Sequence, residues 1–224
     1  MKKTFLFVLL AVASSSAAFA QARPGGSMTS KDYTGGGTTD SRNTGFGIKG
    51  GYSLSNFYGS GKDLIPSRNN LNTYHAGVYG QLGFNSFSSV QVELLYSRKG
   101  IQYNNGSNSK TDLNLNYLSL PVLYVANVTE NISFHVGPQV SLLTKVIKDG
   151  KDEDLKANGY NSVDFGGVAG VEARVGPARI GARYDLGLGR IRKDDAQYVG
   201  TATGDKSSFH NQTLQVYVGI GLTQ

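Results

Sequence analysis

The strongest constraint on the fold is that apolar residues recur at every second position from about residue 45 to the end of the chain. In the first such stretch, Phe46, Ile48 and Tyr52 alternate with Lys49 and Ser53. Successive side chains of a β-strand point to opposite faces, so a period of two indicates strands with one apolar and one polar face. No part of this region shows the competing period of 3.6 that indicates helices. The sequence therefore predicts an all-β protein.

Eight stretches follow this pattern and are separated by polar or glycine-containing links. The predicted strands cover residues 46–54, 76–84, 90–97, 114–125, 132–142, 163–175, 179–188 and 214–222. The fourth stretch is apolar on both faces toward its end. We assign its outer face to Leu118, Leu120, Val122 and Tyr124.

The predicted links alternate between short and long. The short links cover residues 85–88, 126–131 and 176–177, and the long ones cover residues 56–73, 104–111, 148–159 and 192–208. Outer-membrane barrels combine short periplasmic turns with longer extracellular loops in this way. With eight strands, both ends of the region fall on the short-turn side, which suits a chain that arrives from the periplasm.

The content of the polar face separates a membrane barrel from a soluble sandwich or calycin-type barrel. The chain has 30 Gly among 224 residues and only 17% charged residues. Its polar face therefore holds too few charges for a solvated exterior, whereas small residues with charges of both signs suit a narrow lumen. Apolar residues then face lipid, and closure pairs every backbone group. We predict an eight-stranded antiparallel up-and-down transmembrane β-barrel.

Aromatic residues support this interpretation because they gather near both predicted strand ends, as in the two interfacial belts of a membrane protein. The group near the short turns is Phe84, Phe87, Tyr124 and Phe134. The group near the long links is Tyr52, Phe57, Tyr58, Tyr74, Tyr96, Tyr103, Tyr160 and Phe165.

Residues 1–20 have the order of a secretory signal peptide. Two lysines precede an apolar stretch, and Ala18-Phe19-Ala20 is a small-x-small cleavage site. We expect residues 21–44, which are rich in Gly, Ser and Thr, to form a flexible segment and residues 45–224 to form the barrel domain. Removal of the leader lowers the formal charge from +6 by its two lysines, and the modest remainder gives no case for nucleic acid. The expected location is the outer membrane of a Gram-negative bacterium.

Several motifs resemble the porin-family outer-membrane β-barrel proteins of the Bacteroidetes, the PorT-like group. They lie at residues 47–56, 92–100, 117–123, 137–138 and 183–188, and the resemblance extends from about residue 46 to residue 222. It implies an eight-stranded outer-membrane barrel. In one branch of this family it also implies a role in protein secretion or gliding.

The polar faces direct a set of charged residues toward the lumen. These are Lys49, Glu93, Glu172, Arg174, Arg179, Arg183 and Asp185. Because unpaired charges in a confined space are costly, we expect the carboxylates to pair with Arg or Lys across the barrel. Such a network is either a plug of salt bridges or a gate that controls ions. We favour the plug because eight strands leave little room for an aqueous path.

Other chemistries have little support, and we expect no cofactor, no metal site and no enzymatic activity. The chain has no Cys, and its three His residues lie far apart in sequence. A Ser133–His135 pair on the polar face has no third orienting group at a defined spacing. The acidic cluster Asp149, Asp152, Glu153 and Asp154 is interleaved with lysines and lacks the spacing of a calcium loop.

The expected partners are the bilayer and lipopolysaccharide of the outer membrane, together with envelope or secretion-machinery proteins. Arg190, Arg192 and Lys193 are candidates for contacts with anionic headgroups. The first functional hypothesis is a structural or interaction protein with a closed or very narrow lumen. The alternatives are a passive porin-like channel for small solutes and, more remotely, an enzyme at the membrane edge.

Overall fold

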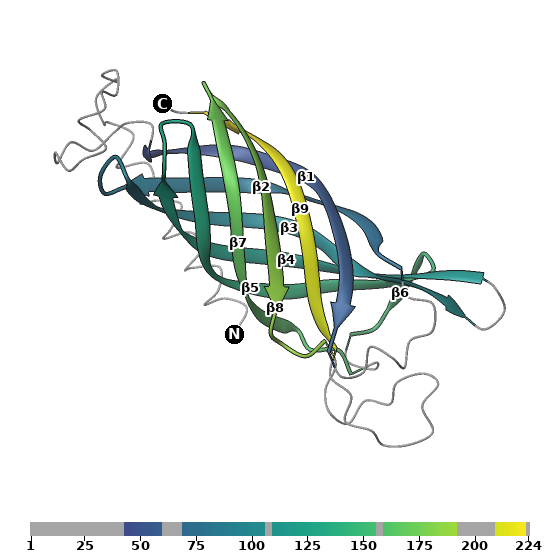
Figure 1. Ribbon diagram of the computed structural model, residues 1–224. Coiled ribbons are helices and arrows are strands. Elements are labelled where there is room, and N and C mark those ends of the chain that lie inside the picture. The colour runs from purple at the N-terminus through teal and green to yellow at the C-terminus, as the bar shows by residue number, and fades with distance from the viewer. Residues whose placement is uncertain (1–42, 60–68, 106–108, 156–158, 192–208, 223–224) are drawn as a thin grey trace.

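Eight long strands close into a single antiparallel barrel (Figure 1). The computed structural model describes residues 43–59, 69–105, 109–155, 159–191 and 209–222. The strands in these ranges are β1 (Gly45–Tyr58), β2 (Leu71–Gly83), β3 (Ser88–Asn105), β4 (Ser109–Asn127), β5 (Ile132–Lys148), β6 (Lys151–Glu153), β7 (Val163–Val175), β8 (Ala178–Gly187) and β9 (His210–Gly221). The sheet runs β4-β3-β2-β1-β9-β8-β7-β5 and is closed by the β4–β5 pairing, while β6 adds to β5 at one end. No helix in the described ranges is long and apolar enough to cross a membrane. The predicted fold is confirmed.

The predicted short turns are confirmed, but three of the predicted long links are partly strand. β2 begins inside the link predicted at residues 56–73, and β3 and β4 leave only residues 106–108 of the link predicted at 104–111. The polar residues of this second link pair with each other across an extended hairpin, from Gln102↔Asp112 to Asn105↔Ser109. Strand β6 lies in the link predicted at 148–159. The strands therefore continue past the point where their lipid-facing pattern ends.

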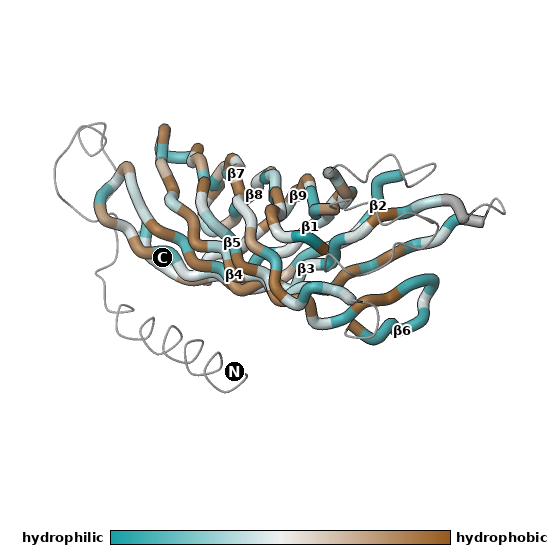
Figure 2. Tube along the Cα trace, turned by 90° about the horizontal axis from the view of Figure 1, so that it is seen from below, coloured by the Kyte–Doolittle hydropathy of each residue, from teal (hydrophilic) through white to brown (hydrophobic). Residues whose placement is uncertain are grey.

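Within most of the barrel, apolar side chains point outward and polar side chains point inward, so teal and brown alternate along the strands in Figure 2. On β1, Ile48 is 47% exposed whereas its neighbour Lys49 is 4% exposed. The phase assigned to the fourth strand is confirmed, because Val122 and Tyr124 face outward and Ser119 is buried. The outer face of the barrel is therefore suited to lipid, and its inner face is mostly polar.

The aromatic belts are only partly as predicted. Near the short turns, the four predicted residues are all exposed, and near the long links so are Tyr52, Tyr74, Tyr96 and Phe165. Tyr74, on the outer side of β2, and Phe84, directly after the end of β2, stand ten residues apart, a spacing that suits the 9–11 residues of a transmembrane strand. Phe57 and Tyr160, however, are buried. Their assignment to a lipid-facing belt was wrong.

Phe57 and Tyr160 belong to an apolar cluster inside the loop end of the barrel, which we call the outer cap. Its members are Phe57, Ile101, Leu115, Tyr117, Leu143, Val146, Tyr160, Ile191 and Phe209, with Tyr103, Leu113 and Leu155 packed against them. Strands β1, β3, β4 and β5 supply one part of the cap, and the links around β7 and β8 supply the rest. At this end the barrel is apolar inside.

At the opposite end, the residue two positions before β1 closes the interior. Asn43 is 1% exposed, and its side-chain amide donates to the carbonyl oxygens of Asn85 (2.9 Å) and Ser86 (2.8 Å) in the β2–β3 turn. The hydroxyl of Thr44 accepts a hydrogen bond from the backbone N–H of Gly83 (3.0 Å). These two residues were expected to be flexible, and that expectation was wrong because both form specific contacts with the barrel. The rest of that segment and the signal peptide lie outside the described residues.

Candidate functional site: the lumen charge network

All seven charged residues predicted for the lumen lie on the inner face of the barrel. They come from β1, β3, β7 and β8, and alternation along each strand directs them inward. Six of them are buried, and the seventh, Arg174, is half-buried with a side chain that is 11% exposed. The salt bridges join six of the seven into one network and leave Asp185 in a separate pair.

Glu93 is the central acceptor. Its Oε1 lies 2.8 Å from Nζ of Lys49 on β1, and its Oε2 lies 2.6 Å from Nη1 of Arg183 on β8. Gln91 donates to the same carboxylate (2.5 Å), and Gln215 accepts from Nε of Arg183 (2.5 Å). The carboxylate of Glu93, on β3, therefore links β1 and β8 across the interior, and no two of these three strands are direct neighbours in the sheet.

Glu172 collects a second group of contacts closer to the short turns. Arg179 donates to its Oε1 (3.2 Å), and Tyr217 donates its hydroxyl to Oε2 (2.9 Å). Nζ of Lys49 is 3.9 Å from Oε2 and 4.2 Å from the centre of the Tyr217 ring. Lys49 therefore connects Glu93 with Glu172 by its charge. It also makes a cation–π contact with the Tyr217 ring, whose hydroxyl is bonded to Glu172.

Asp185 pairs with a residue that the sequence analysis left out of the network. Its Oδ2 lies 2.8 Å from Nζ of Lys99 and accepts from Nε2 of Gln139 (2.9 Å). Lys99 lies two positions beyond the end of the predicted third strand, although it continues the polar phase of that strand. Asp164, also inward, accepts from the backbone N–H of Gly189 (2.9 Å) and from Asn211 (3.2 Å).

The short-turn end of the lumen, which we call the inner mouth, is closed by a ring of polar side chains. Oδ1 of Asn43 accepts from Asn127 (2.7 Å) and from Nη1 of Arg174 (3.0 Å). Next to this ring, Gln81 accepts from Nη1 of Arg179 (2.7 Å). The interior is therefore occupied at three levels, by the inner mouth, the salt-bridge network and the outer cap.

The structure brings Ser133 and His135 together without the geometry of a catalytic triad. Oγ of Ser133 lies 3.0 Å from Nε2 of His135, and the nearest carboxylate oxygen, Oε1 of Glu172, lies 3.9 Å from the same nitrogen. A triad requires the acid on the other ring nitrogen. Both residues are also buried in the lumen.

No group of three or more metal-ligating side chains lies within the described parts of the chain. The acidic cluster near β6 instead makes local contacts. Asp152 pairs with Lys145 (2.8 Å), and Asp149 accepts from the Thr111 hydroxyl (3.2 Å). Of the three candidates for headgroup contacts, Arg192 and Lys193 lie outside the described residues, and Arg190 is exposed at the loop end.

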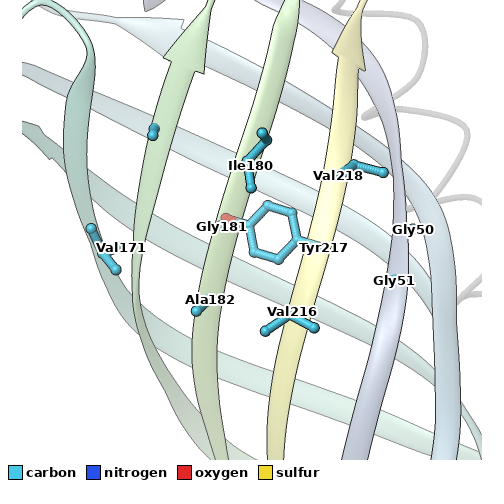
Figure 3. Close-up of a pocket in the computed structure, with 10 residues that line it drawn as sticks. Gly50, Gly51, Val171, Ile180, Gly181, Ala182, Val216, Tyr217 and Val218 are labelled. Carbon is cyan, nitrogen blue, oxygen red and sulfur yellow. The ribbon is translucent and has the colours of Figure 1, made fainter.

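A shallow depression of about 480 Å³ lies on the outer wall over β1, β7, β8 and β9 (Figure 3). Figure 3 shows the ring of Tyr217 lying against Gly181 beneath this depression. A Cβ atom at Gly181 would collide with that ring, so only glycine lets Tyr217 reach Glu172 here. The depression is almost entirely apolar and faces lipid, so it is separate from the charged lumen.

Comparison with known proteins identifies the family. The family described as outer membrane protein beta-barrel domain matches residues 19–192. The chain belongs to this family. No curated protein sequence matches it.

Several solved structures are similar to this chain at low sequence identity. Ail, the attachment invasion locus protein of Yersinia pestis, is 15% identical, with 80% of this chain and 99% of Ail covered and a TM-score of 0.45. Neisserial surface protein A is 15% identical, with 78% and 96% covered and a TM-score of 0.49. OprG from Pseudomonas aeruginosa is 13% identical, with 84% and 99% covered and a TM-score of 0.46.

Proposed function

We propose that this outer-membrane barrel is a closed structural or interaction component of the cell envelope and that its lumen network is a plug. The observation that carries the proposal is the occupation of the interior at three successive levels. An ion that entered from the short-turn end would have to displace Asn43, then separate Glu93 from Lys49 and Arg183, and then pass the outer cap. Each of these steps removes buried polar or apolar contacts that stabilise the fold.

In this proposal the protein acts through its outer surfaces. The leader directs it to the outer membrane of a Gram-negative bacterium, where lipopolysaccharide surrounds the loop end. The motifs shared with the PorT-like proteins of the Bacteroidetes favour a partner among envelope or secretion-machinery proteins. The extended β3–β4 hairpin supports this proposal because it continues past the lipid-facing part of the barrel (Figure 1). The proposal assigns no catalytic role to Ser133 or His135.

Single-channel conductance of the refolded full chain in a planar bilayer tests the proposal. A mobility difference between unheated and boiled samples on a gel first confirms that the barrel is folded. We expect a folded barrel that shows no discrete current steps at either sign of the voltage. Steps whose size changes in Glu93→Gln, but not in the control Glu130→Gln in the exposed β4–β5 turn, would establish a passive channel instead.

A further inference from the structure

The charges in the half of the lumen nearest the inner mouth do not balance. The network there contains four cationic side chains, Lys49, Arg174, Arg179 and Arg183, but only two carboxylates, Glu93 and Glu172. Asp185 does not compensate for them because it is paired with Lys99. Among the residues that the structure describes, this half therefore has two positive charges in excess, even with His135 neutral. Uncompensated buried charge is strongly unfavourable.

The excess is greatest at Arg174 and Arg179, which are direct cross-strand neighbours on β7 and β8. Like charges in such a pair repel each other. Within the described part of the chain, the one carboxylate paired with them is Glu172, whose Oε1 is 3.2 Å from Nη1 of Arg179 and 3.6 Å from Nε of Arg174. The second of these distances is too long for a hydrogen bond. One carboxylate is therefore shared unequally between two guanidinium groups.

Three buried donors at this place have no acceptor within the described part of the chain. They are Nε and Nη2 of Arg174 and the hydroxyl of Tyr79. Nη1 of Arg174 is already bonded to Asn43. Nε and Nη2 lie on the same side of a guanidinium group and present two parallel N–H bonds, the fork that binds a carboxylate or phosphate through two oxygens. Tyr79 belongs to the same group because the guanidinium of Arg179 lies 4.6 Å from the centre of its ring.

We propose that the inner mouth is a binding site for one small oxyanion, a carboxylate or phosphate group. Nε and Nη2 of Arg174 hold two of its oxygens, the Tyr79 hydroxyl donates to it, and Arg179 supplies the second positive charge. Asn43 covers the site from the short-turn end, which faces the periplasm in barrels of this kind. The site does not depend on whether the lumen conducts, so it goes beyond the proposed function.

The source of this group is a free oxyanion of the periplasm, and inorganic phosphate is the probe used in the experiment.

The test measures the unfolding equilibrium of the refolded full chain in vesicles as sodium phosphate is increased, with ionic strength held constant by sodium chloride. A ligand that binds only the folded state raises the folding constant about a hundredfold at a concentration of 100 Kd. We expect this phosphate dependence in the wild type and its loss in Arg174→Gln. The matched control is Arg98→Gln, because Arg98 lies on the outer side of β3 and its Nε bonds to Asn116 (3.1 Å).

Tyr79→Phe keeps the test decisive if Arg174→Gln fails to fold. It removes only a hydroxyl that has no partner in the described structure, so the barrel should fold. We expect the affinity for phosphate to fall about tenfold or more, the usual effect of losing a hydrogen bond to a charged group. An unchanged affinity in Tyr79→Phe would contradict the site.

If the wild type does not respond to phosphate, or if Arg174→Gln and Tyr79→Phe respond as the wild type does, the proposal is wrong.

Discussion

The membrane-spanning part of the barrel and its loop end use the same strands with opposite polarity. On β4, the spanning part presents Val122 outward and Ser119 inward, whereas the loop end buries Leu115 and leaves Asn114 and Asp112 on the outer side. β3 changes in the same way, from Glu93 inside to Ile101 inside. The spanning part has an apolar outer face, suited to lipid, and a mostly polar interior. The loop end has a polar outer face, suited to water, and an apolar interior. The comparison shows that the inner face is buried in both parts, and that the surroundings of the outer face decide which of the two faces is apolar.

A β-bulge at the border between the two parts preserves this arrangement. Asn116 pairs with Lys145 but Tyr117 pairs with Leu143, so Thr144 is an extra residue in β5. An extra residue reverses the facing of every side chain beyond it. Because of the bulge, Val146 points into the outer cap and Lys145 points outward to Asp152. Without it, Lys145 would point into the cap.

The largest effect is expected from breaking the polar interior of the spanning part. Glu93→Ala leaves Lys49 and Arg183 buried without their main partner, which should lower the free energy of unfolding by about 3–5 kcal/mol. Urea unfolding of the refolded barrel in vesicles measures this, with Glu130→Ala in the exposed β4–β5 turn as control. A loss no larger than that of the control would show that the network contributes nothing to stability.

A cavity in the apolar interior of the loop end should come next. Leu115→Ala leaves a cavity in the outer cap and should cost about 2–5 kcal/mol, chiefly as faster hydrogen exchange of amides in the cap. The matched control is Leu118→Ala, three residues along on the outer side of β4, where lipid chains fill the space that is left. Equal effects at the two positions would mean that both leucines face the same surroundings.

A charge placed on the outer face should distinguish lipid from water. Val218→Arg, on the lipid-facing side of β9, should destabilise the barrel by about 2–4 kcal/mol. Asn114→Arg, on the outer side of β4 beyond the border, should leave stability almost unchanged. Chemical unfolding of the two variants side by side therefore locates the membrane surface on the barrel. Similar losses in both would place the border further along the hairpin.

The smallest effect is expected at the border itself. The guanidinium of Arg98 lies 5.1 Å from the centre of the Tyr74 ring, and its Nε donates to Asn116 (3.1 Å). Arg98→Gln should lower the free energy of unfolding by about 0.5–1 kcal/mol, as for an exposed cation–π pair. A loss of several kcal/mol in the same unfolding assay would mean that Arg98 is buried by lipid headgroups.

The sequence was sufficient for the strands, the facing of the spanning part and the charged residues of the lumen, because each follows from local alternation. The prediction failed at the loop end, where the outward-facing residues of the alternating pattern change from apolar to polar. Phe57 and Tyr160 were assigned to a belt because nothing in a period of two marks the point at which a strand leaves the membrane. Lys99 was missed for the related reason that the third strand was ended too early.

The inner mouth could not be predicted for a different reason. Asn43 is 84 positions from Asn127 and 131 positions from Arg174, yet it bonds to both. No local pattern encodes such contacts, and the surrounding Gly, Ser and Thr residues show no apolar periodicity. Which carboxylate pairs with which cation was also unpredictable, since that depends on how the closed barrel places its opposite walls.

The polar outer sides of the hairpins at the loop end make insertion of the barrel into the membrane difficult to reverse. Once β3–β4 and β5–β6 have crossed the bilayer, their outer sides carry Lys110, Asp112 and Lys145 beyond it. To withdraw, each Lys would have to pass the hydrocarbon midplane at a cost of about 2–4 kcal/mol. The outer cap would also have to come apart first. The loop end thus acts as a latch that holds the barrel in the membrane in one orientation.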